Sequence, residues 1–149
     1  STNGLRAFDR TLQQTHIWLN DVTEELGFGD RQQAYHALRA VLHALRDRLS
    51  VEETAELSAQ LPLLVRGLYY EGWNPPSGEV SRDRSEAAFL AQIEREFLVG
   101  PESIDPRALT EAVLRVLGRH VSDGELSHVR RSLPASVQKL WPGPDGSSS

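Results

Sequence analysis

Five histidines are the side chains best suited to metal or acid–base chemistry, and their spacing limits what they can do. They are His16, His36, His43, His120 and His128. No two of them have the i, i+4 spacing that places two imidazoles around zinc on one helical face. His36 and His43 stand seven residues apart and can share a face. We expect helix-surface histidines and no metal, with a metal site or a pH-sensitive contact as the alternatives.

Motifs for catalysis or nucleotide binding are missing from the sequence. Ser50 and Ser122 have acidic neighbours, but no Gly-x-Ser-x-Gly turn surrounds either of them. No glycine-rich phosphate-binding motif is present, and the chain has no cysteine to serve as a nucleophile. We therefore predict no catalytic residue, no cofactor and no enzymatic activity.

An aromatic cluster gives the first candidate binding site. Tyr and Trp combine a large apolar area with a polar tip and are favoured at protein-binding hot spots. The partner-binding candidates are Tyr69, Tyr70, Trp73, Arg66 and Trp141. The alternative is that Tyr69, Trp73 and Trp141 only seal a hydrophobic core.

A local basic excess near the carboxyl end gives the second candidate site. The segments 51–70 and 123–141 each have the outline of a helix-turn-helix. The nucleic-acid candidates are Arg119, His128, Arg130 and Arg131. The formal charge of the whole chain is −5, which argues against general nucleic-acid binding. Hairpins of an ordinary helical bundle are therefore the alternative.

Length and composition fit a small protein with a core of its own. The chain has 149 residues, of which 39% are apolar and 25% charged. No apolar run approaches the roughly 20 residues that span a bilayer, and no export leader is visible. Since cysteine is absent as well, we expect a cytoplasmic protein without a membrane contact.

The sequence matches itself without a gap at a fixed offset of 72. Ser50-x-x-Glu53 falls on Ser122-x-x-Glu125, and Leu61-Pro62 falls on Leu133-Pro134. Matches at this offset are concentrated at apolar and helix-boundary positions. We therefore predict two tandem copies of one unit, packed into a single compact domain. The first copy spans 5–70, a connector 71–82 and the second copy 83–142, and a disordered tail follows at 143–149.

Boundary signals and apolar spacing predict four helices in each copy. Both Ser-x-x-Glu strings read as capping boxes that open helices over 51–60 and 123–132. Pro62 and Pro134 suit the first position of a fourth helix. Longer helices are expected up to Gly27, over 30–48 and over 106–119. The expected core residues of the longer helices are Phe8, Leu12, Leu19, Val22, Leu26, Tyr35, Leu38, Val41, Leu42, Leu45, Leu49, Phe89, Ile93, Phe97, Leu109, Ala112, Val113, Val116 and Leu117. No strand is predicted, so the fold class is all-α with eight helices.

Several long strings of the sequence carry a resemblance. Residues 37–49 read Ala-Leu-Arg-Ala-Val-Leu-His-Ala-Leu-Arg-Asp-Arg-Leu, and residues 61–73 read Leu-Pro-Leu-Leu-Val-Arg-Gly-Leu-Tyr-Tyr-Glu-Gly-Trp. With residues 8–12, 18–19, 113–117 and 133–134, these strings resemble the bacterial domain-of-unknown-function family numbered 2267, over about 5–142. The resemblance implies a small, soluble, helical bacterial protein with a stress or dormancy context. It supplies no catalytic residue.

Taken together, these patterns predict a non-enzymatic protein-binding or adaptor module whose partner is another protein. One alternative is a nucleic-acid or ribosome-associated factor that acts through the basic second copy. Another is a small-ligand-binding protein or enzyme with a pocket where the two copies meet. The fold alone does not decide among them.

Overall fold

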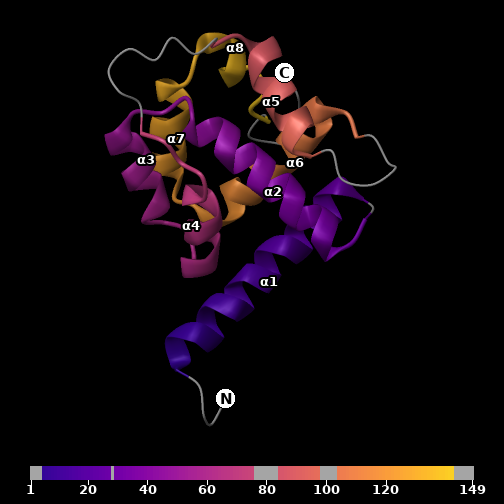
Figure 1. Ribbon diagram of the computed structural model, residues 1–149, viewed down its shortest axis with the longest axis vertical. Helices are drawn as coiled ribbons and strands as arrows, with labels where there is room; N and C mark the ends of the chain where they lie inside the picture. Colours follow the sequence, from indigo (N-terminus) through magenta and orange to yellow (C-terminus); the bar gives the residue numbers. More distant parts are fainter. Residues whose placement is uncertain (1–4, 28, 76–83, 98–103, 143–149) are drawn as a thin grey trace.

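The computed structural model describes residues 5–27, 29–75, 84–97 and 104–142. These residues form eight helices and no strand, which confirms the predicted all-α class (Figure 1). In chain order the helices are α1 (Arg6–Leu26), α2 (Arg31–Arg46), α3 (Val51–Ser58), α4 (Leu63–Tyr70), α5 (Glu86–Glu96), α6 (Pro106–His120), α7 (Asp123–Ser132) and α8 (Ala135–Gln138). Most of the predicted connector and the whole predicted tail lie outside the described residues. None of these eight helices is both long and apolar enough to cross a bilayer.

Local sequence signals set several of the helix ends. Gly27 ends α1 in the left-handed region at φ 80°, where a residue without Cβ is least strained. Asp30 and Gln33 form a capping box at the start of α2. Ser50 and Glu53 form the predicted box at the start of α3, so two otherwise orphaned backbone N–H groups are satisfied there.

The second predicted capping box is wrong in one respect, because only one of its two hydrogen bonds forms. Ser122 Oγ accepts from the backbone N–H of Glu125 as expected. The Glu125 carboxylate does not return the bond, because the N–H of Ser122 donates to Gln60 Oε1 at 2.8 Å. Pro62 and Pro134 also lie one residue earlier than predicted, at the cap positions of α4 and α8.

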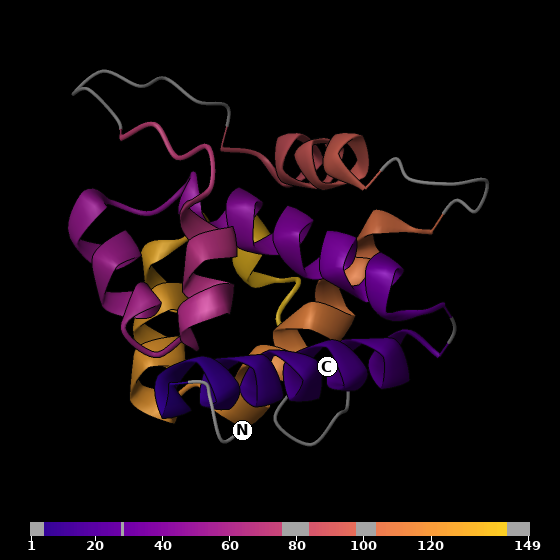
Figure 2. The ribbon, with the colours of Figure 1, turned by 60° about the horizontal axis from the view of Figure 1, so that its bottom comes forward.

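The helices form a layered arrangement around a central pair (Figure 2). Helices α2 and α6 contact each other, α1 packs on both of them, and α5 packs on both of them as well. Figure 2 shows α1 and α5 on opposite sides of α2, with α3, α4 and α7 gathered at one end. Each half of the chain therefore completes its core with helices of the other half.

The positions of the shorter helices agree with the offset found in the sequence. Helix α3 begins at Val51 and α7 at the matching position, Asp123, while α4 and α8 begin at the matching positions Leu63 and Ala135. Helix α3 of the first half packs on α7 of the second half. Descent of the two halves from one duplicated unit stays a prediction.

The core contains most of the expected apolar positions, with three corrections. Phe89, Ile93 and the predicted apolar residues of α6 are buried. Phe8 and Leu12 are instead 55% and 49% exposed, because the first turns of α1 extend past the other helices (Figure 1). Tyr35 is also partly exposed, at the first turns of α2.

Two buried polar side chains of α2 hold the carboxyl end of α4. His43 Nε2 donates to the carbonyl oxygen of Leu68 at 2.9 Å. Arg46 donates to the carbonyl oxygens of Tyr69 and Glu71, both at 2.9 Å. The last carbonyls of a helix have no intrahelical partner, so these bonds replace the water that α4 loses there.

Candidate functional site

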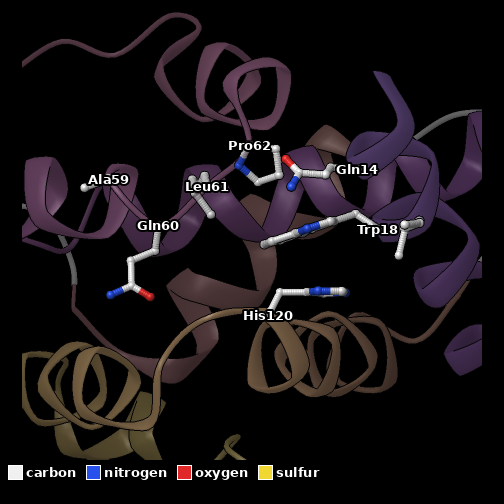
Figure 3. Close-up of a pocket in the computed structure, with 8 residues that line it drawn as sticks. Gln14, Trp18, Ala59, Gln60, Leu61, Pro62 and His120 are labelled. Carbon is white, nitrogen blue, oxygen red and sulfur yellow. The ribbon is translucent and has the colours of Figure 1, made fainter. Parts of the chain in front are cut away.

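A stacked aromatic pair lies between α1 and α6. Trp18 of α1 and His120, the last residue of α6, have ring centroids 4.8 Å apart and planes inclined by 18° (Figure 3). Trp18 is on the buried stripe of α1 and is 3% exposed. The other edge of the His120 ring is held by Asp21, whose Oδ2 lies 2.7 Å from Nε2. The imidazole is therefore fixed on one face and at one edge.

A cavity of about 350 Å³ opens beside this pair. Helix α1, the turn between α3 and α4, and the end of α6 form its walls (Figure 3). The lining residues are Gln14, Ile17, Trp18, Ala59, Gln60, Leu61, Pro62 and His120. Because α6 belongs to the second half of the chain and the other walls to the first, the cavity lies where the two halves meet. Its volume falls in the range of sites for a small ligand or a large side chain.

Hydrogen bonds position the polar and apolar walls of the cavity. Gln60 donates to Ser122 Oγ at 3.1 Å and accepts from the backbone N–H of Ser122, which locks its amide. Arg66 donates to the carbonyl oxygens of Ser58 and Leu61 at 2.9 and 3.1 Å. Arg66, predicted as a partner contact, thus holds the turn that carries Leu61 and Pro62.

Charged side chains close the seam between α1 and α6 beside the stacked pair. Arg119 is hydrogen-bonded to Glu25 and lies 3.5 Å from Asp21, so Asp21 serves both Arg119 and His120. Arg115 lies 3.8 Å from Glu25. Pairs as exposed as these contribute on the order of 0–1 kcal/mol each. Their main effect is to orient Asp21 and His120.

The chemistry available in this cavity is limited. An Asp–His pair can move a proton, but none of the residues that line the cavity offers a hydroxyl or thiol for it to activate. Among the described residues no group of three or more His, Asp or Glu side chains has the arrangement of a metal site. Apolar walls with a few fixed polar groups suit binding better than covalent chemistry.

Exposed apolar side chains lie at the cavity, at the start of α4 and on the first turns of α1. Ile17 lines the cavity and is 45% exposed. Thr11 Oγ1 accepts from the backbone N–H of Leu64, which joins the start of α4 to α1. We name as the amino-terminal apolar surface the exposed residues Leu5, Phe8, Leu12, Leu63 and Leu64. Four of these residues are on the two joined helices and Leu5 caps α1, and so many exposed large apolar residues are an uncommon feature of a monomeric surface.

The fold keeps three residues of the predicted aromatic cluster together, and the ring centroids of Tyr69 and Tyr70 are 5.2 Å apart. Tyr69 is fully buried, and its hydroxyl donates to the carbonyl oxygen of Thr54 at 3.0 Å. Burial raises the pKa of this hydroxyl above its ordinary value. Tyr70 and Trp73 are partly buried, and their ring centroids are 5.4 Å apart. None of the three lines the cavity, so the structure gives Tyr69 a core position and leaves Tyr70 and Trp73 at the carboxyl end of α4.

Trp141 and two of the predicted nucleic-acid residues come together elsewhere. Trp141, Arg119 and Arg130 line a second cavity, formed by α6, α7 and the segment after α8. His128 instead faces carboxylates of α3, with Nε2 3.4 Å from Glu56. Arg131 is exposed on α7. The predicted nucleic-acid residues therefore do not form one basic surface. Arg119 and Arg130 line a cavity, and His128 faces acidic side chains of α3.

Sequence reasoning missed Trp18, Asp21, Gln60 and His120 as a site. One signal for the seam was available. Asp21 and Glu25 on α1, and Arg115 and Arg119 on α6, each stand four residues apart and form opposite charged rows. Complementary rows favour pairing of these two helices, but the cavity depends on where the α3–α4 turn packs.

Comparison with known families gives one match. The model of a family described as "Uncharacterized conserved protein (DUF2267)" matches residues 15–140. The match includes Trp18, Gln60 and His120, whereas Phe8 and Leu12 precede it. None of the curated proteins matches the chain.

Proposed function

The chain belongs to the DUF2267 family of uncharacterized conserved proteins, and we propose that it is a non-enzymatic protein-binding module. One observation carries this proposal: the cavity beside Trp18 and His120 is lined by the exposed Ile17 and by Pro62, and the exposed Leu63 and Leu64 follow Pro62 directly in the chain. A pocket with exposed apolar side chains beside it is typical of an interface hot spot.

The cavity suits an anchor side chain of the partner. Its volume of about 350 Å³ accommodates one large apolar residue, and Trp18, Leu61 and Pro62 supply apolar contact. The locked amide of Gln60 and the oriented ring of His120 add polar contacts. Burying one such anchor contributes about 1.5–3 kcal/mol before the costs of association.

The amino-terminal apolar surface supplies further apolar area for a partner. Its members are between 46% and 62% exposed, so each retains substantial apolar surface for a partner to bury. An amphipathic helix of the partner, laid along α1, fits a row of this kind.

The alternatives receive less support from the geometry. A small-ligand site or enzyme at the junction needs converging Tyr, Arg and Glu side chains, and none of these lines the cavity. A nucleic-acid surface is weakened because Arg119 and His128 face carboxylates. We further propose a bacterial cytoplasmic setting with a stress association, supported only by the absence of cysteine and by the family resemblance.

Site-specific photo-crosslinking tests the proposal in cells of the source organism. A benzophenone amino acid would replace Ile17 or Leu63 in separate variants, and Glu94 in a control. Glu94 is exposed on α5, on the opposite side of the molecule from α1 (Figure 2). We expect a discrete protein adduct from Ile17 and Leu63 and none from Glu94.

The mass of a cross-linked adduct shows which molecule the protein binds. Mass spectrometry of the adduct identifies the partner, and an adduct of doubled mass identifies a second copy of the chain. Leu63→Glu in the Ile17 variant should abolish the adduct. Identical adduct patterns from Ile17, Leu63 and Glu94 would reject the proposal.

A further inference from the structure

The second cavity has a composition different from the first. It has a volume of about 670 Å³ and lies between α6, α7 and the segment after α8. Three arginines and one tryptophan line it, whereas the first cavity contains no arginine. A cavity with several guanidinium groups and one aromatic ring matches a ligand that is both anionic and planar.

The arginines offer donors to the cavity from two helices. Arg115 and Arg119 stand four residues apart on α6 and therefore share one face. Arg130 extends from the last turn of α7 and forms no ion pair within the described residues. Arg115 contacts one carboxylate of α1 and Arg119 contacts two, but a guanidinium has five N–H donors, so these contacts leave others available. Phosphate oxygens accept bidentate bonds from this fork.

An aromatic side chain and a glycine line the same cavity as those arginine donors. Trp141 is partly buried against the core, so its ring is held while part of it remains exposed. Gly118 also lines the cavity from α6, and a Cβ placed there would meet no atom within 4 Å. Part of the Trp141 ring is thus open to the cavity, and stacking of a nucleobase on an aromatic side chain is a favourable contact.

We propose that this cavity binds a small molecule that combines an aromatic ring with phosphate, of the mononucleotide class. The ring stacks on Trp141, and the phosphate accepts from Arg130 and Arg115. Asp123, which also lines the cavity, is an acceptor suited to sugar hydroxyls. This site is separate from the proposed protein-binding surface and does not depend on it.

Charge favours a small nucleotide over a nucleic-acid strand. The chain carries −5 overall, and Asp21, Glu25 and Asp123 lie close to the arginines. A long phosphate backbone needs a continuous basic surface, whereas one phosphate group needs only two or three donors.

Calorimetric titration of the full chain with ADP tests the proposal, with adenosine and inorganic phosphate as separate ligands. We expect ADP to bind with a micromolar dissociation constant, and each fragment to bind at least tenfold more weakly. Arg130→Gln should weaken ADP binding about tenfold, the usual effect of losing a hydrogen bond to a charged group. Trp141→Leu should also weaken it about tenfold.

Control variants test whether ADP binds in this cavity and nowhere else on the protein. Arg95→Gln removes an exposed arginine of α5 outside the cavity and should leave the affinity unchanged. Circular dichroism of each variant reports whether it folds, and Arg130→Gln changes only an exposed residue. The proposal is overturned by no binding at millimolar ADP, or by equal affinity in Arg130→Gln and the wild type. Tighter, steeply salt-dependent binding of a single-stranded oligonucleotide would overturn it in favour of nucleic acid.

Discussion

Tyr69 and Trp141 occupy matching positions near the ends of the two halves, and they serve different purposes. Helix α4 runs for eight residues and turns Tyr69 into the core, where its hydroxyl bonds to Thr54. Helix α8 has only four residues, so Trp141 lies beyond its end and lines a cavity. Matching sequence positions therefore do not imply matching burial, because the length of the local helix decides where the ring points.

The starts of α3 and α7 show a similar difference. Glu53 completes a capping box and also accepts from Ser132. Glu125 is its counterpart in the second half, but there Gln60 replaces the glutamate as acceptor for the backbone N–H of Ser122. Oε2 of Glu125 is buried and has no hydrogen-bond partner among the described residues. The carboxylate of the first half is thus the more completely hydrogen-bonded of the two, and the carboxylate of the second half keeps an unsatisfied buried oxygen.

The largest expected difference in the free energy of unfolding is between variants of Tyr69 and Trp141. Tyr69→Ala should lower the free energy of unfolding by about 3–5 kcal/mol, because it leaves a cavity in the core. Trp141→Ala should cost only about 1–2 kcal/mol, since the ring is already partly exposed. Urea denaturation followed by circular dichroism measures both values, and equal losses would contradict the distinction.

His43 and Arg115 form the next matched pair of the two halves. His43 is 2% exposed and lies between the Leu68 carbonyl and the Glu96 carboxylate. His43→Ala should lower the free energy of unfolding by about 2–4 kcal/mol, because the Leu68 carbonyl oxygen loses its donor and the Glu96 carboxylate loses its imidazole partner. Arg115→Ala at the exposed position should change it by about 0.5 kcal/mol or less. Two similar values from denaturant titration would show that the first half has no special role in holding α4.

The two glutamates should respond to pH in opposite directions. Burial alone raises the pKa of Glu53, but hydrogen bonds from Ser132 and Ser50 outweigh burial and lower it. Its contribution to stability is therefore present above the ordinary value of about 4.5 and is lost as the pH falls through the lowered pKa. Burial and the nearby Glu56 raise the pKa of Glu125, so its charge destabilises the fold at neutral pH.

Amide variants test this difference. Glu53→Gln should reduce the free energy of unfolding at pH 7 by on the order of 0.5–1 kcal/mol, and the reduction should shrink below about pH 4.5. Glu125→Gln should increase stability at pH 7, and the increase should vanish as the pH falls through the raised pKa of the wild-type carboxyl. Thermal melts between pH 3 and 7 measure both trends. Shifts of the same sign would refute the comparison.

The smallest change in the free energy of unfolding is expected for a substitution on the exposed first turns of α1. Leu12→Gln should change the free energy of unfolding by about 0.5 kcal/mol or less, because the side chain is 49% exposed. Leu19→Gln, one heptad later on the same face, should cost several times more, because Leu19 is 9% exposed. If both substitutions destabilise equally in urea titration, the first turns of α1 are covered in solution.

The sequence by itself determined the helices and most of their ends. Gly27, Asp30 and Ser50 act within a few residues of their own backbone, so local chemistry was sufficient to predict their roles or positions. The apolar spacing of α6 and the all-α class were predictable for the same reason. Family membership also followed from strings of residues, because it is a property of sequence alone.

Only the tertiary structure decided which surfaces remain open. Phe8 and Leu12 continue the apolar stripe of α1, yet both stay about half exposed, although the start of α4 reaches Thr11 between them. Trp18 and His120 are far apart in the sequence and meet because α1 packs on α6 of the other half. Burial and cavities depend on where separate helices end relative to one another. That relation is set by long-range packing, and no local spacing in the sequence encodes it.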